Sequence, residues 1–237
     1  MRLLLTGVVF LAISGGNAVA AATAEPRERD QGRLLFENAC SSCHGATGLG
    51  TINGPALTES GAAGAHFMLS TGRMPLDDPG RQPIRKPPAF NPEQIRTITA
   101  FVATLGTGPD IPEVNQASGD LVKGEELYSS NCAACHSSAG AGGAVGAGQE
   151  APSLGKATPV EIVEAMRIGP GAMPVFGKST LSDHDANSIT RYLIYLRTLP
   201  NHGGWGMGRV GPIPEGFVAL AGMGLLLAVC RWIGTKS

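Results

Sequence analysis

Two five-residue stretches, Cys40-Ser41-Ser42-Cys43-His44 and Cys132-Ala133-Ala134-Cys135-His136, decide how this chain folds and what it can bind. The pattern Cys-x-x-Cys-His is typical of covalent c-type haem attachment. Each thiol adds to one haem vinyl group, the spacer matches the separation of the vinyls, and the histidine is held under the iron. The sequence therefore predicts two haem c groups, attached through Cys40, Cys43, Cys132 and Cys135, with His44 and His136 as proximal ligands.

Cys-x-x-Cys pairs also occur in zinc sites and in thiol-redox motifs. A zinc ribbon places its second pair about 15–20 residues after the first, whereas these pairs begin at residues 40 and 132. A thioredoxin motif follows a strand of a βαβ unit, whereas both pairs here close short amphipathic helical stretches. Neither alternative accounts for a histidine after both pairs, so we prefer the haem interpretation.

An internal repeat surrounds the two motifs. Residues 32–40 align without a gap with residues 124–132, which makes Phe36 and Tyr128 equivalent. The alignment continues in two turns, where Gly54-Pro55-Ala56-Leu57 corresponds to Ala151-Pro152-Ser153-Leu154 and Arg73-Met74-Pro75 corresponds to Ala172-Met173-Pro174. Each half therefore consists, in order, of a helix, a haem motif, an irregular loop, a short helix, a methionine loop and a final helix.

Each half ends in a predicted amphipathic helix. Asn91 to Gln94 supplies an N-cap, a proline at the first helical position and a capping-box partner, and Ser182 to Asp185 opens the second helix. Apolar stripes at helical spacing follow, formed by Ile95, Ile98, Phe101, Val102 and Leu105 and by Ile189, Tyr192, Leu193, Leu196 and Leu199. We expect Phe101 to pack near Phe36 and Tyr192 near Tyr128. No alternating strand pattern is found, so the predicted fold class is all-α.

The methionine loops predict the second axial ligand. Met74 and Met173 lie in Gly/Pro-rich stretches, and each is followed by a proline that rigidifies the loop. A thioether is a soft donor that favours ferrous iron and raises the reduction potential. We therefore expect Met74 and Met173 to be the distal ligands. The competing candidates are Met68 and Met166, which favour core packing on short helices, and His66 and His184, which would give bis-histidine ligation.

The turns after the haem motifs predict how the two histidine rings are oriented. The carbonyls of Pro55 and Pro152 are candidate acceptors for the Nδ1–H of His44 and His136, a contact that fixes the ring and increases its basicity. Two further loops, residues 76–90 and 137–148, differ between the halves. They are either solvated loops or surfaces that flank the haem edges and meet partner proteins.

Both ends of the chain carry membrane signals. Residues 1–20 have a basic start, an apolar run and a small-residue cleavage site at Ala18-Val19-Ala20, as in a cleaved signal peptide; a retained anchor is the alternative. Residues 213–233 are apolar apart from Glu215 and Arg231 and just long enough to span a bilayer, which takes about 20 residues. Arg231 and Lys236 at the far end place the C-terminus in the cytoplasm and both haem domains on the outer face of the cell membrane.

The bulk properties agree with two small domains. The chain has 237 residues, a net charge of −1, 34 glycines and 17 prolines, and no basic patch that would indicate nucleic acid. Predicted domains at residues 25–107 and 119–201 are joined by a linker at 108–118, and a Gly-rich linker at 202–212 leads to the span. Domains of this size have small cores, and a covalently bound haem would compensate as disulfides do elsewhere.

The arrangement resembles the dihaem cytochrome c subunit of the actinobacterial-type menaquinol–cytochrome c reductase, the cytochrome bcc complex. The match is carried by residues 70–75, by the Gly-Pro-x-x-Met-Pro pattern at 169–174 and by residues 211–216 before the span. The resemblance implies two tandem cytochrome c folds, with His44 and Met74 on one iron and His136 and Met173 on the other. It also implies that electrons pass from the Rieske iron–sulfur protein, beside cytochrome b, through both haems to the copper centre of a terminal oxidase.

Two other classes of function stay open. A dihaem peroxidase or small-molecule dehydrogenase would need an iron with an open distal position, which the presence of a Met-Pro sequence in both halves disfavours. The sequence barely distinguishes a free membrane-anchored carrier that serves several reductases from a subunit of a complex. In the favoured interpretation the chain has no substrate site of its own and belongs to an enzyme only as an electron-transfer component.

Overall fold

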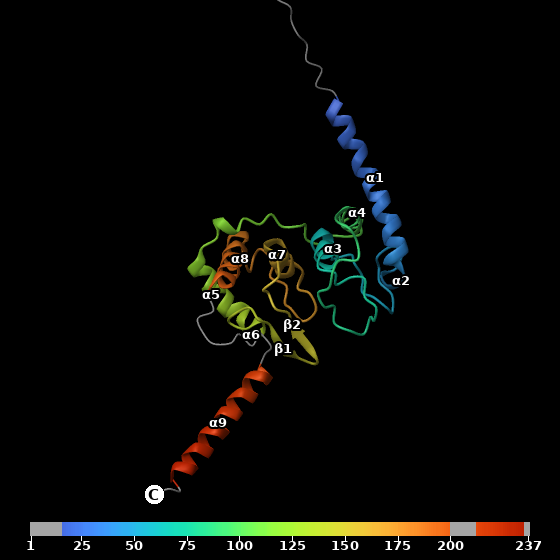
Figure 1. Ribbon diagram of the computed structural model, residues 1–237. Helices are drawn as coiled ribbons and strands as arrows, with labels where there is room; N and C mark the ends of the chain where they lie inside the picture. The colour runs from blue at the N-terminus through green and yellow to red at the C-terminus, as the bar shows by residue number, and fades with distance from the viewer. Residues whose placement is uncertain (1–15, 200–211, 235–237) are drawn as a thin grey trace, which may run out of the picture. The chain divides into compact units, whose positions relative to one another are not determined.

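The computed structural model describes residues 16–199 and 212–234, which fall into two compact units divided between Ile111 and Pro112 (Figure 1). Unit 1 contains α1 (Gly16–Ala39), α2 (Ser41–His44), α3 (Gly61–Ser70) and α4 (Pro92–Val102). Unit 2 contains a 3₁₀ turn η1 (Gln116–Ser118), α5 (Leu121–Asn131), α6 (Ala133–His136), β1 (Gly143–Gly146), β2 (Gln149–Ala151), α7 (Pro159–Ile168), α8 (Asp183–Thr198) and α9 (Pro212–Gly234). The described chain is mostly helical, as predicted.

Unit 1 is built on the packing of α1 and α3 against α4 (Figure 1). Gly32 of α1 lies directly on the backbone of Thr97 in α4, where an added Cβ would clash. One turn later Phe36 is fully buried, and its ring lies 5.3 Å from that of Phe101. The capping box predicted between Asn91 and Gln94 is present at the start of α4. The predicted aromatic contact and helix start are therefore both confirmed.

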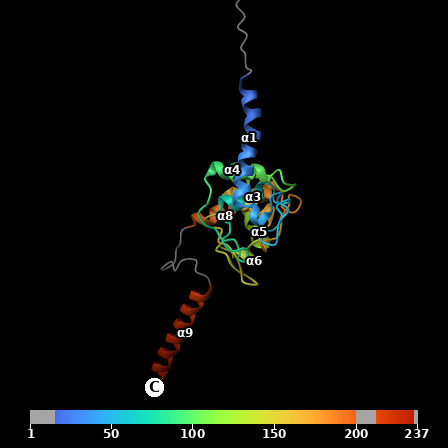
Figure 2. The ribbon, with the colours of Figure 1, turned by 90° about the vertical axis from the view of Figure 1, so that its right-hand side faces the viewer.

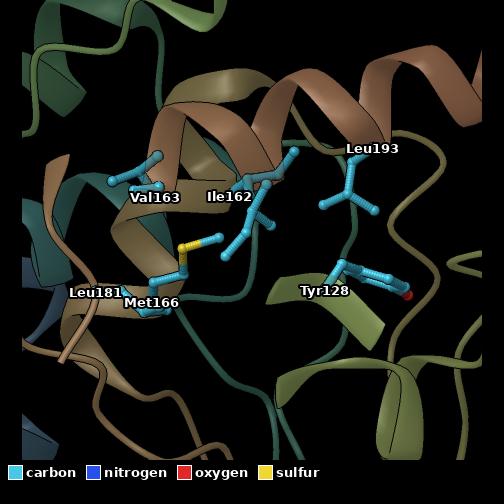
Figure 3. Close-up of a cluster of buried hydrophobic side chains, with 8 residues drawn as sticks. Tyr128, Ile162, Val163, Met166, Leu181 and Leu193 are labelled. Carbon is cyan, nitrogen blue, oxygen red and sulfur yellow. The ribbon is translucent and has the colours of Figure 1, made fainter. Parts of the chain in front are cut away.

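Unit 2 repeats this packing with α5, α7 and α8. Gly124 lies against the backbone of Ser188, as Gly32 lies against Thr97, and the Tyr128 and Tyr192 rings are 5.7 Å apart. Figure 3 shows the apolar side chains gathered between these helices. The buried core consists of Tyr128, Ile162, Val163, Met166, Leu181, Ala186, Ile189 and Leu193.

The two predicted apolar stripes agree with the structure except at their last residues, Leu105 and Leu199. Leu105 lies beyond the end of α4 but still packs against the unit 1 core. Leu199 is 47% exposed, and its assignment to the second stripe was wrong. The backbone turns to an extended conformation at Leu199, directly after α8 ends, so the helical spacing no longer directs its side chain to the core.

A small hairpin departs from the all-α prediction. β1 and β2 pair antiparallel, with Gly143 opposite Ala151, in a stretch that the sequence presents as a Gly/Ala loop. The turn between them uses positive φ angles at Gly146, Ala147 and Gly148. Gly and Ala are depleted in strands, so the residue types carried no strand signal, and the pairing depends on backbone geometry.

The C-terminal helix α9 is one continuous apolar helix (Figures 1 and 2). Residues 216–234 have a mean hydropathy of 1.9 and are not buried, so α9 is a candidate membrane span by length and composition. Its bounds, Pro212–Gly234, enclose the predicted span of 213–233. Most of the predicted signal peptide and of the linker at 202–212 lies outside the described residues, so cleavage near Ala20 stays a prediction.

Candidate haem sites

The two Cys-x-x-Cys-His motifs have the same backbone geometry. The first cysteine of each motif lies at the break between two helices, with φ/ψ of −124°/−30° at Cys40 and −120°/−36° at Cys132. In both motifs the histidine N–H donates to the carbonyl of this cysteine over 2.9 Å. The second cysteine and the histidine of each motif therefore lie on one short helical turn, α2 in unit 1 and α6 in unit 2, and the first cysteine is the N-cap of that turn.

The histidine rings are held by the carbonyls that the sequence predicted. His44 Nδ1 lies 2.8 Å from the Pro55 oxygen, and His136 Nδ1 lies 3.0 Å from the Pro152 oxygen. A carbonyl oxygen only accepts, so Nδ1 must donate in both rings, which leaves the Nε2 lone pair of a neutral ring available for a metal. Burial lowers the pKa of His136, which also favours the neutral ring.

The loop after each motif folds back on the histidine. Gly50 N–H donates to the His44 carbonyl over 2.8 Å, and Gly142 N–H donates to the His136 carbonyl over 2.9 Å. The residue that follows each histidine has a positive φ, 76° at Gly45 and 60° at Ser137. This conformation is strained for a serine.

Two hydrogen bonds stabilise the strained serine. The Ser137 carbonyl accepts the Tyr128 hydroxyl over 2.6 Å, and its Oγ accepts the Ala141 N–H over 3.0 Å. Sequence reasoning missed this role of Ser137. Its alignment with Gly45 was the available signal, because glycine is the default residue at positive φ.

The structure brings each predicted methionine to the same core as the attachment cysteine. Cys40 and Met74 both pack against the unit 1 core, and Cys132 and Met173 both pack against the unit 2 core. Burial, together with the neighbouring motif cysteine, raises the pKa of the Cys40 and Cys132 thiols to about 11. Each unit thus combines two thiols, an oriented imidazole and a soft thioether at an apolar core, and these groups fit a covalently attached haem.

The competing ligand candidates differ from one another in burial and position. Met166 is 3% exposed and fills the unit 2 core (Figure 3). Met68 is half-buried on α3, and its carbonyl accepts the Met74 N–H over 3.1 Å. His66 is half-buried on α3, and His184 is exposed in the first turn of α8. The core role expected for Met166 is therefore confirmed.

The methionine loops are closed by contacts that the sequence analysis missed. In unit 1, Gly72 lies directly against the Lys86 and Pro87 backbone, and Lys86 N–H donates to the Thr71 carbonyl over 3.2 Å. In unit 2 the corresponding closure uses the side chain of Arg167. No local pattern marked Arg167, because its partners are 9 to 16 residues further along the chain.

Comparison with known families agrees with the two units. The family model "Cytochrome c" matches residues 30–106, and the model "Cytochrome C oxidase, cbb3-type, subunit III" matches residues 119–193. Helix order, haem-motif geometry and these matches define the class: the chain is a c-type cytochrome with two cytochrome c domains, a haem protein of electron transport.

Relatives of nearly the full length identify the family. The cytochrome bc1 complex cytochrome c subunit of Corynebacterium diphtheriae is 34% identical over 98% of this chain and 91% of its own length. Subunits of the same name from Mycobacterium leprae and Mycobacterium tuberculosis are each 36% identical over 97% of this chain and over 86% and 89% of their own lengths. The chain belongs to the family of cytochrome bc1 complex cytochrome c subunits, which confirms the resemblance found in the sequence.

Proposed function

We propose that this chain carries two covalently attached haem c groups and relays electrons from the Rieske protein of a quinol–cytochrome c reductase towards a terminal oxidase. The observation that carries the proposal is the repeated site: in both units the first motif cysteine and a half-buried methionine pack against the same core, and the histidine of the motif is oriented by a proline carbonyl. With a histidine and a methionine both bound, the iron of either unit would have no open position for a substrate. Each site is therefore suited to electron exchange alone.

Haem iron supplies one-electron exchange between its ferric and ferrous states. In each unit the two motif cysteines form the thioether links, Cys40 with Cys43 and Cys132 with Cys135. His44 and His136 bind through Nε2, and the Pro55 and Pro152 carbonyls hold the rings in place. Met74 and Met173 would supply soft thioethers, which favour the ferrous state and raise the reduction potential.

The proposed partners follow from family membership and from α9. As a subunit of a bc1 complex, the chain would lie beside the cytochrome b and Rieske subunits. The apolar helix α9 would anchor it in the cell membrane, with Arg231 and Lys236 on the cytoplasmic side and both haem domains on the outer face. Electrons would then leave to the copper centre of a terminal oxidase, and the chain would have no substrate site of its own.

Ligation of the two irons tests the proposal directly. The purified full-length protein and its Met74→Ala and Met173→Ala variants would be compared by absorption and magnetic circular dichroism. We expect two low-spin irons with methionine bound in the unmutated protein and the loss of one methionine signal in each variant. Met68→Leu and Met166→Leu are the matched controls and should keep both signals. A high-spin or exchangeable iron in the unmutated protein would instead indicate an enzyme.

Co-purification separates a complex subunit from a free carrier. An affinity-tagged full-length chain, isolated from membranes in mild detergent, should bring down the cytochrome b and Rieske proteins in constant ratio. Quinol should then reduce both haems in the isolated complex. If the tagged chain is recovered alone, with normal haem spectra, the free membrane-anchored carrier is the correct interpretation.

A further inference from the structure

Arg167 is a buried cation at the C-terminal end of α7. Its side chain is only 5% exposed. Burying a charge is costly unless the charge is paired and hydrogen-bonded, and Arg167 meets both conditions. Its Nη1 donates to the Phe176 carbonyl over 2.8 Å and to the Leu181 carbonyl over 2.7 Å, and its Nη2 donates to Asp183 Oδ1 over 2.9 Å.

These three bonds close the loop that carries Met173. The loop leaves α7 at Gly169 and reaches α8 at Ser182. Arg167 binds its middle, through Phe176, and its end, through Leu181 and Asp183. Phe176 N–H also donates to the Met166 carbonyl over 2.8 Å. Only two residues, Pro174 and Val175, therefore separate Met173 from Phe176, whose carbonyl the guanidinium holds against α7.

Unit 1 has a methionine, Met68, at the position of Arg167, and its buried arginine, Arg73, stands inside the loop directly before Met74, with the guanidinium 4.7 Å from the centroid of the Phe67 ring. Met68 stands six residues before Met74, as Arg167 stands six residues before Met173. There the loop is held by backbone contacts, between Gly72 and the Lys86–Pro87 segment and between Lys86 N–H and the Thr71 carbonyl. The two distal loops are thus closed by different means, although both carry the same Met-Pro sequence.

We propose that Arg167 is the positioning residue of the second haem site, where it holds the Met173 loop closed so that the thioether remains on the iron. The inference rests on the proposed ligation by Met173. Arg167 acts through the residues to which it donates, the backbone at Phe176 and Leu181 and the carboxylate of Asp183. Ferric iron binds a thioether less strongly than ferrous iron does, so an opened loop releases methionine from the ferric state first.

The test uses full-length protein with Arg167→Gln and Arg167→Lys substitutions. Methionine ligation is followed by the ferric methionine-to-iron charge-transfer band during an alkaline titration, and both haem potentials are measured by redox titration. For Arg167→Gln we expect the second haem to lose methionine at a pH lower by about one unit or more, a roughly tenfold change in exchange equilibrium. Its potential should fall while that of the first haem stays constant. Arg167→Lys keeps the charge but cannot span all three acceptors, so its shift should be smaller.

The matched control is Arg191→Gln. Arg191 also donates to a backbone carbonyl in unit 2, that of Gly119 over 2.6 Å, but this bond lies outside the methionine loop. The control should lower thermal stability without moving either haem's ligation. If Arg167→Gln leaves the titration and the potential unchanged, or changes them no more than Arg191→Gln does, the inference is wrong and the proposed function stands. If the unmutated protein lacks a second methionine signal, both are wrong.

Discussion

Among single residues, His44 and His136 owe their orientation to backbone carbonyls and not to other side chains. The acceptor is a backbone carbonyl, so its position depends on the conformation of the loop at Pro55 and Pro152 and not on a side-chain group. The strained φ at Ser137 belongs to the same loop, and Tyr128 stabilises it through its hydroxyl. The geometry of the proximal side is therefore set by how the loop folds back on the histidine.

Asp185 gives a pH-dependent prediction at this scale. Hydrogen bonds from Lys123 and then Ser182 hold its pKa down to about 2, from an ordinary value of 3.8. A folded-state pKa below the unfolded value adds stability above about pH 4, and this stability is lost as the pH falls towards 2. The melting temperature of Asp185→Asn should therefore be lower than that of the unmutated protein at pH 6, and the gap should narrow by pH 3.

An exposed carboxylate in the same unit provides the comparison. Glu113→Gln should leave the melting temperature almost unchanged at both pH values, because the side chain is exposed. A gap for Asp185→Asn that is as wide at pH 3 as at pH 6 would contradict the assigned pKa shift.

Among elements, one helix crossing organises each unit. Gly32 in α1 and Gly124 in α5 allow the first helix to contact the backbone of the last one, at Thr97 and Ser188. The aromatic pairs lie one turn further on, with ring separations of 5.3 and 5.7 Å. This crossing places the C-terminal end of the first helix, and the haem motif that follows it, over the core to which the methionine loop also packs.

Gly124→Ala should therefore destabilise unit 2. The new Cβ would clash with the Ser188 carbonyl, and overpacking of this kind costs about 1–3 kcal/mol. Denaturant unfolding followed by circular dichroism measures the loss. Gly143→Ala is the control, because its Cβ would meet no atom closer than 3.6 Å and its stability should be unchanged. Equal stability of the Gly124 and Gly143 variants would mean that the helices do not cross as described.

For the whole molecule, α9 is the candidate membrane anchor. Residues 216–234 have a mean hydropathy of 1.9 and bury no side chains against the rest of the described chain. Such a surface is unfavourable in water. The length of α9 is that expected of a bilayer span, whereas units 1 and 2 each bury a hydrophobic core of their own.

A chain that ends at Leu199 should consequently be water-soluble and keep both haems. The full-length protein should remain in the membrane fraction after washing with high salt and alkaline carbonate, because α9 is held by apolar contact and not by charge. Fractionation followed by haem staining measures both results. Extraction of the full-length protein by carbonate alone would rule out α9 as the anchor, and a membrane-bound truncated chain would mean that residues 1–20 are retained as a second anchor.

The sequence by itself determined the features that depend on neighbouring residues. The spacing within each Cys-x-x-Cys-His motif, the capping boxes of α4 and α8 and the apolar stripes at Ile98 and Ile189 all act over one or two helical turns. The repeat then indicated equivalent aromatic pairs and equivalent proline carbonyls, because two aligned segments must fold alike. These features were sufficient to predict the fold class, the candidate ligands and the family.

Only the tertiary structure decided how each methionine loop is closed, where the chain forms a hairpin and how Ser137 tolerates its positive φ. Arg167 binds carbonyls 9 and 14 residues away, and β1 pairs with β2 through the backbone of residues with little strand propensity. Backbone acceptors are the same in every residue and leave no mark in the sequence. Contacts made to them appear only when the chain is folded and distant segments lie side by side.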